Sequence, residues 1–255
     1  MEWSQKHRRE LTQRGSIILF HGLTSSPEEL SSLTGVLRGH RFEVSTPHLA
    51  GHTDIELLRR THLKVWLEDA VGTLASISAD AGPLFVGGSS FGALLALYIA
   101  TLQRWPINGL VLLAPPLRLR RRFDEARLRI LAQLPETIID RLGTRAKNRG
   151  REGRLSLPRS CLEAHSVASI VRLVKLRELI MPKLTELGIP ILIVQDPHDH
   201  LVHPDGVDPF IEAAEHTEVD TVWLPGAEHE LTLGPRHTEV SHTVSEFLNR
   251  LCLAK

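Results

Sequence analysis

The sequence predicts an α/β protein built on a mostly parallel, doubly wound sheet of about six strands. Continuous apolar strands are typical of a parallel sheet that is covered on both faces. The sequence has six short apolar runs, most of which lack polar–apolar alternation. They are residues 16–20, 42–46, 84–86, 110–113, 191–194 and 219–224. Helical patterns lie between these runs, which is the second observation: residues 27–38, 62–78, 91–103, 205–216 and 235–251. Repeated alternation of strand and helix favours helices on both faces of one sheet.

Length and charge narrow the class of protein. The chain has 255 residues and is 42% hydrophobic, which is enough for one large core. Its 30 basic and 30 acidic residues balance, so no global charge favours nucleic acid as a partner. The apolar run at residues 17–20 is too short for a signal segment or a membrane span. We therefore expect a cytoplasmic protein without stable membrane insertion.

The two cysteines carry no recognisable site. Cys161 and Cys252 form neither a disulfide framework nor the spacing of a metal centre. The sequence therefore predicts no metal and no cofactor.

Residues 117–187 interrupt the alternation of strands and helices. They show helical spacing, as at Ile130, Leu134 and Ile138, and no convincing strand. We expect a mostly helical cap inserted into a core formed by residues 1–116 and 188–255. Residues 117–159 hold 13 basic and five acidic residues, a net charge of +8. The simpler interpretation is a solvated basic face, and the functional hypothesis is attraction of a carboxylate- or phosphate-bearing substrate.

A serine between glycines follows the third apolar run. Gly88-Ser89-Ser90-Phe91-Gly92 matches G-x-S-x-G only with Ser90 at its centre, because the register of Ser89 would need glycine at position 91. This spacing is typical of a strained strand-to-helix turn that pushes its middle residue outward. A Cβ atom at Gly88 or Gly92 would clash in such a turn. The pattern predicts Ser90 as a nucleophile.

A serine hydroxyl needs a base, and the base needs an orienting acid. In this architecture they follow in the order Ser, Asp or Glu, His. The loop after the fifth strand offers Asp196 and Asp199; Asp199 is favoured, because it lies farther along the loop and reaches toward the next one. His229 lies on that next loop and is the expected base. The choice between the two acids stays open at this point.

Acyl transfer also requires backbone N–H groups that meet the developing oxyanion. The amide of Phe91, directly after the nucleophile, is one expected donor. The other is the amide of Leu23 in the loop after the first strand, where Gly22 permits close approach. In the same loop, Ser26-Pro27-Glu28-Glu29 predicts a capping box at a helix start.

Several segments together carry a family resemblance. They read ILFHGLTSSPEEL, STPHLAGHT, GGSSFGALLAL, LVLLAPP, IPILIVQDPHDHLVHP and LPGAEH, in this order. The chain resembles the α/β-hydrolase superfamily, specifically small bacterial carboxylesterases and monoacylglycerol-lipase-like proteins. The resemblance implies a Ser90–Asp199–His229 triad, an oxyanion hole at the Leu23 and Phe91 amides, and an acyl-enzyme formed from a small-molecule ester. Little chain precedes the first strand, so the first two antiparallel strands of the family have little room.

Other functions remain open. Thioesterase, lactonase, acyltransferase and carbon–carbon bond hydrolase activities use the same machinery, because substrate choice is set by the cap and pocket. The spacing of His198, His200 and His203 suggests a metal-dependent hydrolase as a remote alternative. A non-catalytic binding protein on this fold is the third hypothesis.

Overall fold

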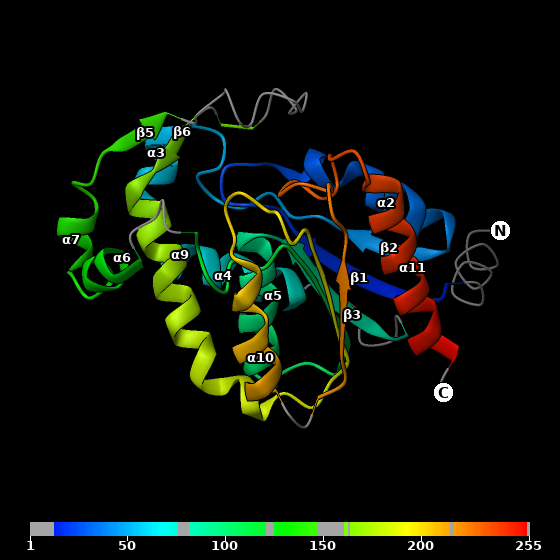
Figure 1. Cartoon of the computed structure of the whole chain (residues 1–255). Coiled ribbons are helices and arrows are strands. Elements are labelled where there is room, and N and C mark those ends of the chain that lie inside the picture. Colours follow the sequence, from blue (N-terminus) through cyan, green and yellow to red (C-terminus); the bar gives the residue numbers. More distant parts are fainter. Residues whose placement is uncertain are drawn as a thin grey trace.

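A six-stranded, all-parallel sheet forms the centre of the molecule (Figure 1). The computed structural model describes residues 13–75, 82–120, 125–146, 161–162, 164–214 and 217–253. The strand order is β2-β1-β3-β4-β7-β8. The strands are β1 (Gly15–Phe20), β2 (Phe42–Ser45), β3 (Leu84–Ser89), β4 (Ile107–Leu113), β7 (Ile191–Gln195) and β8 (Val219–Trp223). The predicted doubly wound parallel sheet is therefore confirmed.

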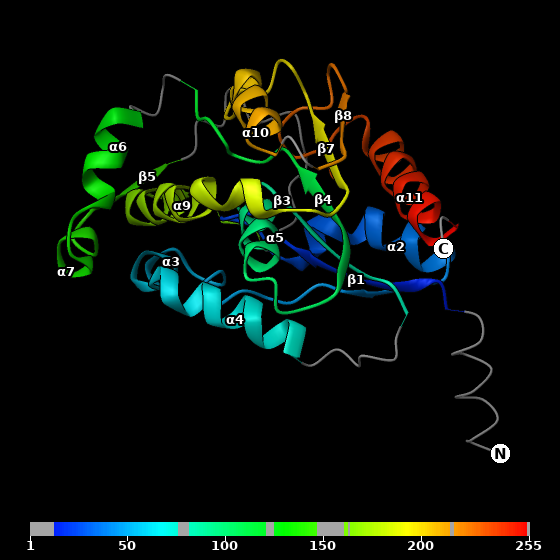
Figure 2. The same cartoon turned by 90° about the horizontal axis from the view of Figure 1, so that it is seen from below.

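Helices cover both faces of this sheet (Figure 2). On one face lie α2 (Ser31–Gly39) and α11 (His237–Leu253), and on the other α4 (Leu63–Ala75), α5 (Phe91–Thr101) and α10 (Asp208–Ala213). Neighbouring residues of one strand serve different cores. Ile17 packs on the α2 and α11 side and Ile18 on the α5 side, and both are fully buried. This two-sided burial is why the strands show no polar–apolar alternation.

Two local predictions need correction, and one helix lies where none was expected. The helix expected from residue 27 begins as a 3-10 turn, η1 (Pro27–Leu30), and Ser26 makes no side-chain cap. The predicted capping box is thus wrong, since the carboxylate of Glu29 binds elsewhere. A separate helix, α3 (Ile55–Arg60), was not predicted; Asp54 caps it by accepting hydrogen bonds from two backbone amides.

The helix expected at residues 205–216 is shorter than predicted. It divides into η3 (Pro204–Gly206) and α10, whose described part ends at residue 213. None of the described helices combines the length and apolar character that crossing a bilayer requires.

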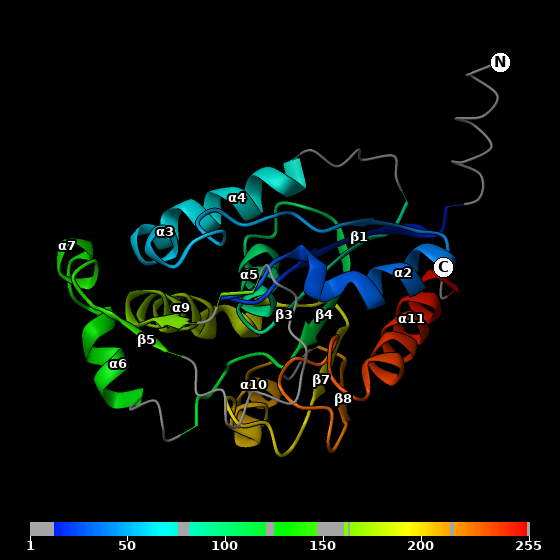
Figure 3. The ribbon, with the colours of Figure 1, turned by 90° about the horizontal axis from the view of Figure 1, so that it is seen from above.

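The insertion after β4 lies beside the sheet, far from the C-terminal helix α11 (Figure 3). Its described elements are α6 (Glu125–Ala132), α7 (Glu136–Ile139), β5 (Thr144–Ala146), β6 (Ala164–Ser166), α9 (Val167–Ile180) and η2 (Met181–Glu186). The expectation of no strand is wrong, because β5 and β6 form an antiparallel pair. Residues 121–124 and 147–159 of the basic stretch lie outside the described part of the chain.

A buried arginine joins the elements of this insertion. The side chain of Arg172, on α9, is fully buried. Its Nε donates to Glu136 at 2.9 Å, its Nη1 donates to the carbonyl of Arg59 at 2.6 Å, and its Nη2 donates to Asp140. The guanidinium thus ties α7 and α3 to α9. A fold tolerates a buried charge that has partners, but removal of one member of such a pair destabilises the fold, because the other is left uncompensated.

We expect Arg172→Met to lower the free energy of unfolding by about 2 kcal/mol, because the change removes one donor from two carboxylates and one from the carbonyl of Arg59. The carboxylates are partly exposed, which moderates the loss. The melting temperature should fall by roughly 4–8 °C. Lys64→Met on α4, where the lysine is largely exposed, is the control and should change it little. Equal melting temperatures for the two variants would contradict this role.

Candidate active site

The turn between β3 and α5 holds Ser90 in a strained conformation. Ser90 has φ 50° and ψ −112°, in the left-handed half of backbone space that serine rarely adopts. A Cβ atom at Gly88 would lie 2.4 Å from the carbonyl carbon of Gly92, and one at Gly92 would lie 2.0 Å from the carbonyl oxygen of Phe20. Both positions therefore require glycine. Both serines line a pocket, but Ser89 is buried at the strand end, whereas Ser90 is half-buried.

Ser90, His229 and Asp199 form one chain of hydrogen bonds. The Nε2 atom of His229 lies 3.0 Å from Ser90 Oγ, and its Nδ1 atom lies 2.6 Å from Asp199 Oδ2. The other carboxylate oxygen of Asp199 accepts hydrogen bonds from the amides of Leu201 and Val202. These two amides fix the carboxylate so that Oδ2 faces the imidazole.

Asp196 has a different set of contacts. Its Oδ1 accepts a hydrogen bond from the amide of His198, and its Oδ2 accepts one from the amide of Glu228 at 2.8 Å. Asp196 therefore joins the loop after β7 to the loop that carries His229. Of the two acids that the sequence offered, only Asp199 contacts the imidazole.

The surroundings of His229 favour its charged form. Burial alone would lower the pKa of His229, but the charge and hydrogen bond of Asp199 outweigh it. The charges of Glu230 and Glu29 act in the same direction, so the pKa of His229 lies above its usual value. Burial raises the pKa of Asp199, but His229 and the backbone amides more than reverse this, and its pKa lies below its usual value.

A buried histidine orients the peptide that carries the amide of Leu23. The Nδ1–H of His21 donates to the carbonyl of Gly22 at 3.0 Å, and the amide of Ser25 donates to the same oxygen at 3.2 Å. The Nε2 atom of His21 accepts from the amide of Leu49 at 3.1 Å. Burial lowers the pKa of His21 to about 3, so the ring is neutral and keeps this tautomer.

Both predicted oxyanion donors are unoccupied within the described part of the chain. Neither the amide of Leu23 nor that of Phe91 donates to a described protein acceptor. Phe91 opens α5, so its amide also lies at the positive end of a helix dipole. Leu23 and Ser90 line the same pocket, and two amides that both point at a developing oxyanion would stabilise it.

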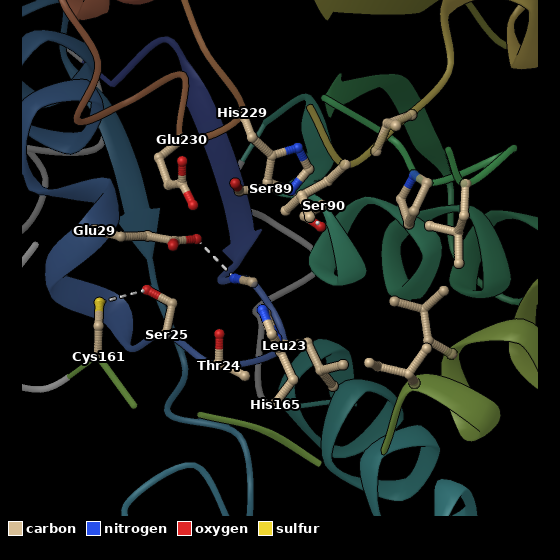
Figure 4. Close-up of a pocket in the computed structure, with 17 residues that line it drawn as sticks. Leu23, Thr24, Ser25, Glu29, Ser89, Ser90, Cys161, His165, His229 and Glu230 are labelled. Carbon is tan, nitrogen blue, oxygen red and sulfur yellow. Dashed lines mark hydrogen bonds between the residues drawn. The ribbon is translucent and has the colours of Figure 1, made fainter. Parts of the chain in front are cut away.

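Glu29 is a pocket residue that the sequence reasoning misread. Its Oε1 accepts a hydrogen bond from the amide of Gly22 at 2.7 Å (Figure 4). The Glu29 side chain thus fixes the peptide directly before the one that carries the Leu23 amide. The space at Gly22 would admit a Cβ, whose nearest neighbours would be the Glu29 oxygens at 3.5 Å. Gly22 is therefore not required by crowding among the described protein atoms.

The pocket in front of Ser90 is lined by apolar and by polar side chains, called here the apolar wall and the polar wall. It encloses about 840 Å³, including its open mouth. Its apolar wall is formed by Leu23, Pro116, Leu119, Ile170, Leu173, Leu201 and Val202. Its polar wall is formed by Thr24, Ser25, Glu29, Cys161, His165 and Glu230. Figure 4 shows these polar residues together on one side of Ser90 and His229.

Comparison with known proteins shows the family to which this chain belongs. The model of the Hydrolase_4 family, described as serine aminopeptidase, S33, matches residues 12–236. The chain belongs to the Hydrolase_4 family. A thermostable monoacylglycerol lipase from Bacillus sp. (strain H-257) is 26% identical over 219 residues, which cover 85% of this chain and 83% of the lipase. The family identifies the protein as a hydrolase, and the relative is a lipase, which supports a serine hydrolase of the lipase and esterase kind.

Solved structures show the same α/β-hydrolase fold. A structure from work on the metagenome-derived lipolytic enzymes LipS and LipT has a TM-score of 0.79 at 20% identity, covering 94% of this chain and 95% of its own. The monoacylglycerol lipase of Paleococcus ferrophilus has a TM-score of 0.75 at 18% identity, with the same coverage. At these identities the likeness establishes the fold alone.

In this Hydrolase_4 member, an arginine from the basic stretch clamps the loop of Asp199. Arg120 donates from Nε to the carbonyl of Asp199 and from Nη2 to the carbonyl of Pro197, the latter at 3.2 Å. The backbone of Leu119 also forms an antiparallel bridge with Val202. The start of the insertion therefore holds the loop that presents the carboxylate.

The histidines of the possible metal site do not gather. Within the described part of the chain, ligand atoms of His198, His200 and His203 do not come together as a metal-binding set. The described trio with suitable spacing is instead His62, Glu136 and Asp140. Its carboxylates already bind Arg172 and Lys175.

We expect Arg120→Ala to lower kcat on the order of tenfold, because a small displacement of the Asp199 loop misplaces the imidazole. Arg118→Ala is the matched control, since Arg118 is exposed and pairs with Asp205 at 3.7 Å. The measurement is steady-state hydrolysis of a p-nitrophenyl ester by both variants. Equal losses would show that the clamp on Asp199 has no special role.

Proposed function

We propose that the protein hydrolyses carboxylic esters of aliphatic acids through a Ser90–His229–Asp199 triad and an acyl-enzyme. The single observation that carries this proposal is the chain of hydrogen bonds from Ser90 Oγ through His229 to Asp199, at 3.0 and 2.6 Å. A serine, a base within hydrogen-bond reach and an orienting acid form the constellation that activates a hydroxyl.

Acylation begins when His229 Nε2 takes the proton of Ser90 Oγ as the oxygen attacks the ester carbonyl carbon. Asp199 stabilises the resulting imidazolium without taking its proton. The carbonyl oxygen becomes an oxyanion and accepts hydrogen bonds from the amides of Leu23 and Phe91. The His229 proton then passes to the alcohol oxygen as the bond between carbonyl carbon and alcohol oxygen breaks, and the alcohol leaves.

Deacylation repeats these steps with water as the nucleophile. His229 removes a proton from the water, whose oxygen attacks the acyl carbon. The second tetrahedral intermediate collapses, the bond to Ser90 Oγ breaks, and His229 returns the proton to the serine. The acid is released and the triad regains its starting state.

The pocket walls support an assignment of the two halves of the ester. The apolar wall fits an aliphatic acyl chain, because apolar contact is the interaction that such a chain gains on leaving water. Ile170 and Leu173 of α9 belong to this wall. We therefore assign residues 117–187 as a cap that shapes the acyl site, and residues 1–116 and 188–255 as the core that carries the triad.

Replacement of the triad tests the proposal. Ser90→Ala and His229→Ala should each lower kcat by on the order of 10⁴–10⁶, because each removes an essential part of one unit. Asp199→Asn should cost at least about a hundredfold more than Asp196→Asn, since only Asp199 contacts the imidazole. The assay uses p-nitrophenyl esters of rising chain length beside acyl-CoA and lactone substrates. Near-normal ester hydrolysis by Ser90→Ala would refute the assignment.

The pH profile provides a separate test. Because His229 accepts a proton only when neutral and its pKa is raised, kcat/KM should rise with pH, with a midpoint above 6.5. Glu230→Gln removes a negative charge that stabilises the imidazolium, so this midpoint should move to lower pH. Glu246→Gln, an exposed residue of α11, is the control and should not move it. An unchanged midpoint in Glu230→Gln would contradict this electrostatic coupling.

A further inference from the structure

Among the described residues, two carboxylates on the polar wall have no lysine or arginine partner, and the charge of His229 acts on both of them. Glu29 is 5% exposed, and Glu230 directly follows His229 and is half-buried. Figure 4 shows Glu230 pointing toward Glu29 beside the imidazole. Within the described part of the chain, no lysine or arginine forms an ion pair with either residue, although both line the pocket.

This arrangement is unusual for a protein interior. Glutamate is almost never fully buried unless it is paired, because transfer of an unpaired carboxylate out of water is costly. Burial, with a smaller effect of the charge of Glu230, raises the pKa of Glu29 to about 7, while hydrogen bonds from Ser25 and from the amide of Gly22 and the charge of His229 lower it. When His229 is neutral, as its role as a base requires, the site holds two acids that repel each other and would both be stabilised by a positive charge between them.

We place the leaving group of the ester beside Glu29 and Glu230 of the polar wall. The two halves of a bound ester diverge from the carbonyl carbon at Ser90, and the apolar wall suits the acyl half. The other half must place its oxygen near His229 Nε2, which supplies the proton on departure. Glu230 adjoins His229 in the chain, Glu29 binds the amide of Gly22 in the oxyanion loop, and both line the pocket, so we place them beside this half.

We propose that Glu29 and Glu230 select the alcohol half of the substrate, and that the preferred substrates are carboxylic esters of cationic amino alcohols. This inference rests on the proposed ester hydrolysis and adds the chemical class of the leaving group. An ammonium group between the carboxylates would relieve their repulsion and satisfy the buried one.

Charge separates this class from its competitors. A neutral polyol could hydrogen-bond to Thr24 and Ser25 but would leave the repulsion between the acids unchanged. An anionic leaving group, such as the phosphate-bearing thiol of acyl-CoA, would add further negative charge. Only a cation would be attracted by both carboxylates and would offset their mutual repulsion. The low dielectric of a half-closed pocket strengthens this attraction.

The test compares esters of one acid that differ in the charge of the alcohol. Butyrylcholine and 3,3-dimethylbutyl butanoate have nearly the same shape and differ by one positive charge. 2-Sulfoethyl butanoate adds a negative charge, and glyceryl monobutanoate adds hydroxyls without charge. Hydrolysis is followed by titration of the released acid at pH 8. We expect kcat/KM for butyrylcholine to exceed that for the dimethylbutyl ester at least about tenfold, and the sulfoethyl ester to be the poorest.

Variants assign this preference to the two carboxylates. Glu230→Gln and Glu29→Gln should each reduce the ratio of the choline ester to the dimethylbutyl ester toward one. Gln at position 29 keeps an oxygen that can accept from the Gly22 amide, and thermal melting checks that each variant is folded. Glu246→Gln removes the same charge from exposed α11 and should leave the ratio as in the wild type.

The outcomes are distinct. Equal rates for the choline and dimethylbutyl esters, or a preference for the sulfoethyl ester, would overturn the inference while ester hydrolysis stands. A preference for the glyceryl ester would show that hydrogen bonding, not charge, selects the alcohol. If the ratio of the choline ester to the dimethylbutyl ester is unchanged in both folded glutamine variants, Glu29 and Glu230 do not select the alcohol and the inference is overturned. Failure to hydrolyse even p-nitrophenyl butanoate would refute the proposed function itself.

Discussion

The close approach of β1 to the turn after β3 is the constraint on which the site depends. Ser90 stays at φ 50° because the surrounding backbone leaves the turn no room to relax: Gly92 lies against the carbonyl of Phe20, and Gly88 lies against Gly92. The register of β1 with β3, which pairs Phe20 with Gly88, sets this contact. The strain of one residue is thus held by the hydrogen-bonded ladder of the central sheet.

The same parallel sheet brings the other groups to Ser90. β1, β3, β7 and β8 all end at one edge, so the loops that follow them share one space. Those loops supply, in order, the Leu23 amide, Ser90, Asp199 and His229. Three further contacts hold the loops in place: Asp196 to the amide of Glu228, Arg120 to the Asp199 loop, and His21 to the carbonyl of Gly22. Each lies outside the proposed triad, and each fixes a loop that presents Asp199, His229 or the Leu23 amide.

What could be predicted from the sequence depended on short-range rules. The spacing of Gly88, Ser90 and Gly92 records a steric requirement that acts within one turn, so the sequence alone indicated which serine lies at the apex. Asp199 could be favoured over Asp196 from loop position, because the carboxyl ends of parallel strands converge. The fold class followed from continuous apolar strands, whose alternate residues enter two cores.

The remaining features depend on partners that are distant in the chain or compete locally. Ser26 to Glu29 has the pattern of a capping box, but the amide of Gly22, seven residues before Glu29, binds the carboxylate instead. Arg120 reaches carbonyls almost 80 residues away, which no periodicity reveals. The pair β5 and β6 consists of three residues in each strand, joined across a long connection. Such pairings are decided by tertiary contacts rather than by local propensity.

These long-range contacts also bear on the electrostatic expectation for two arginines at the start of the basic stretch. The basic stretch suggested attraction of anionic substrates, yet Arg118 pairs with Asp205 and Arg120 binds backbone carbonyls of the Asp199 loop. Neither arginine lines the pocket, whereas Glu29 and Glu230 do. Coulomb forces weaken with distance and with solvent screening, so the charges that line the pocket outweigh those outside it for a bound substrate. The net charge of a segment therefore says little about selectivity until the position of each charged group is known.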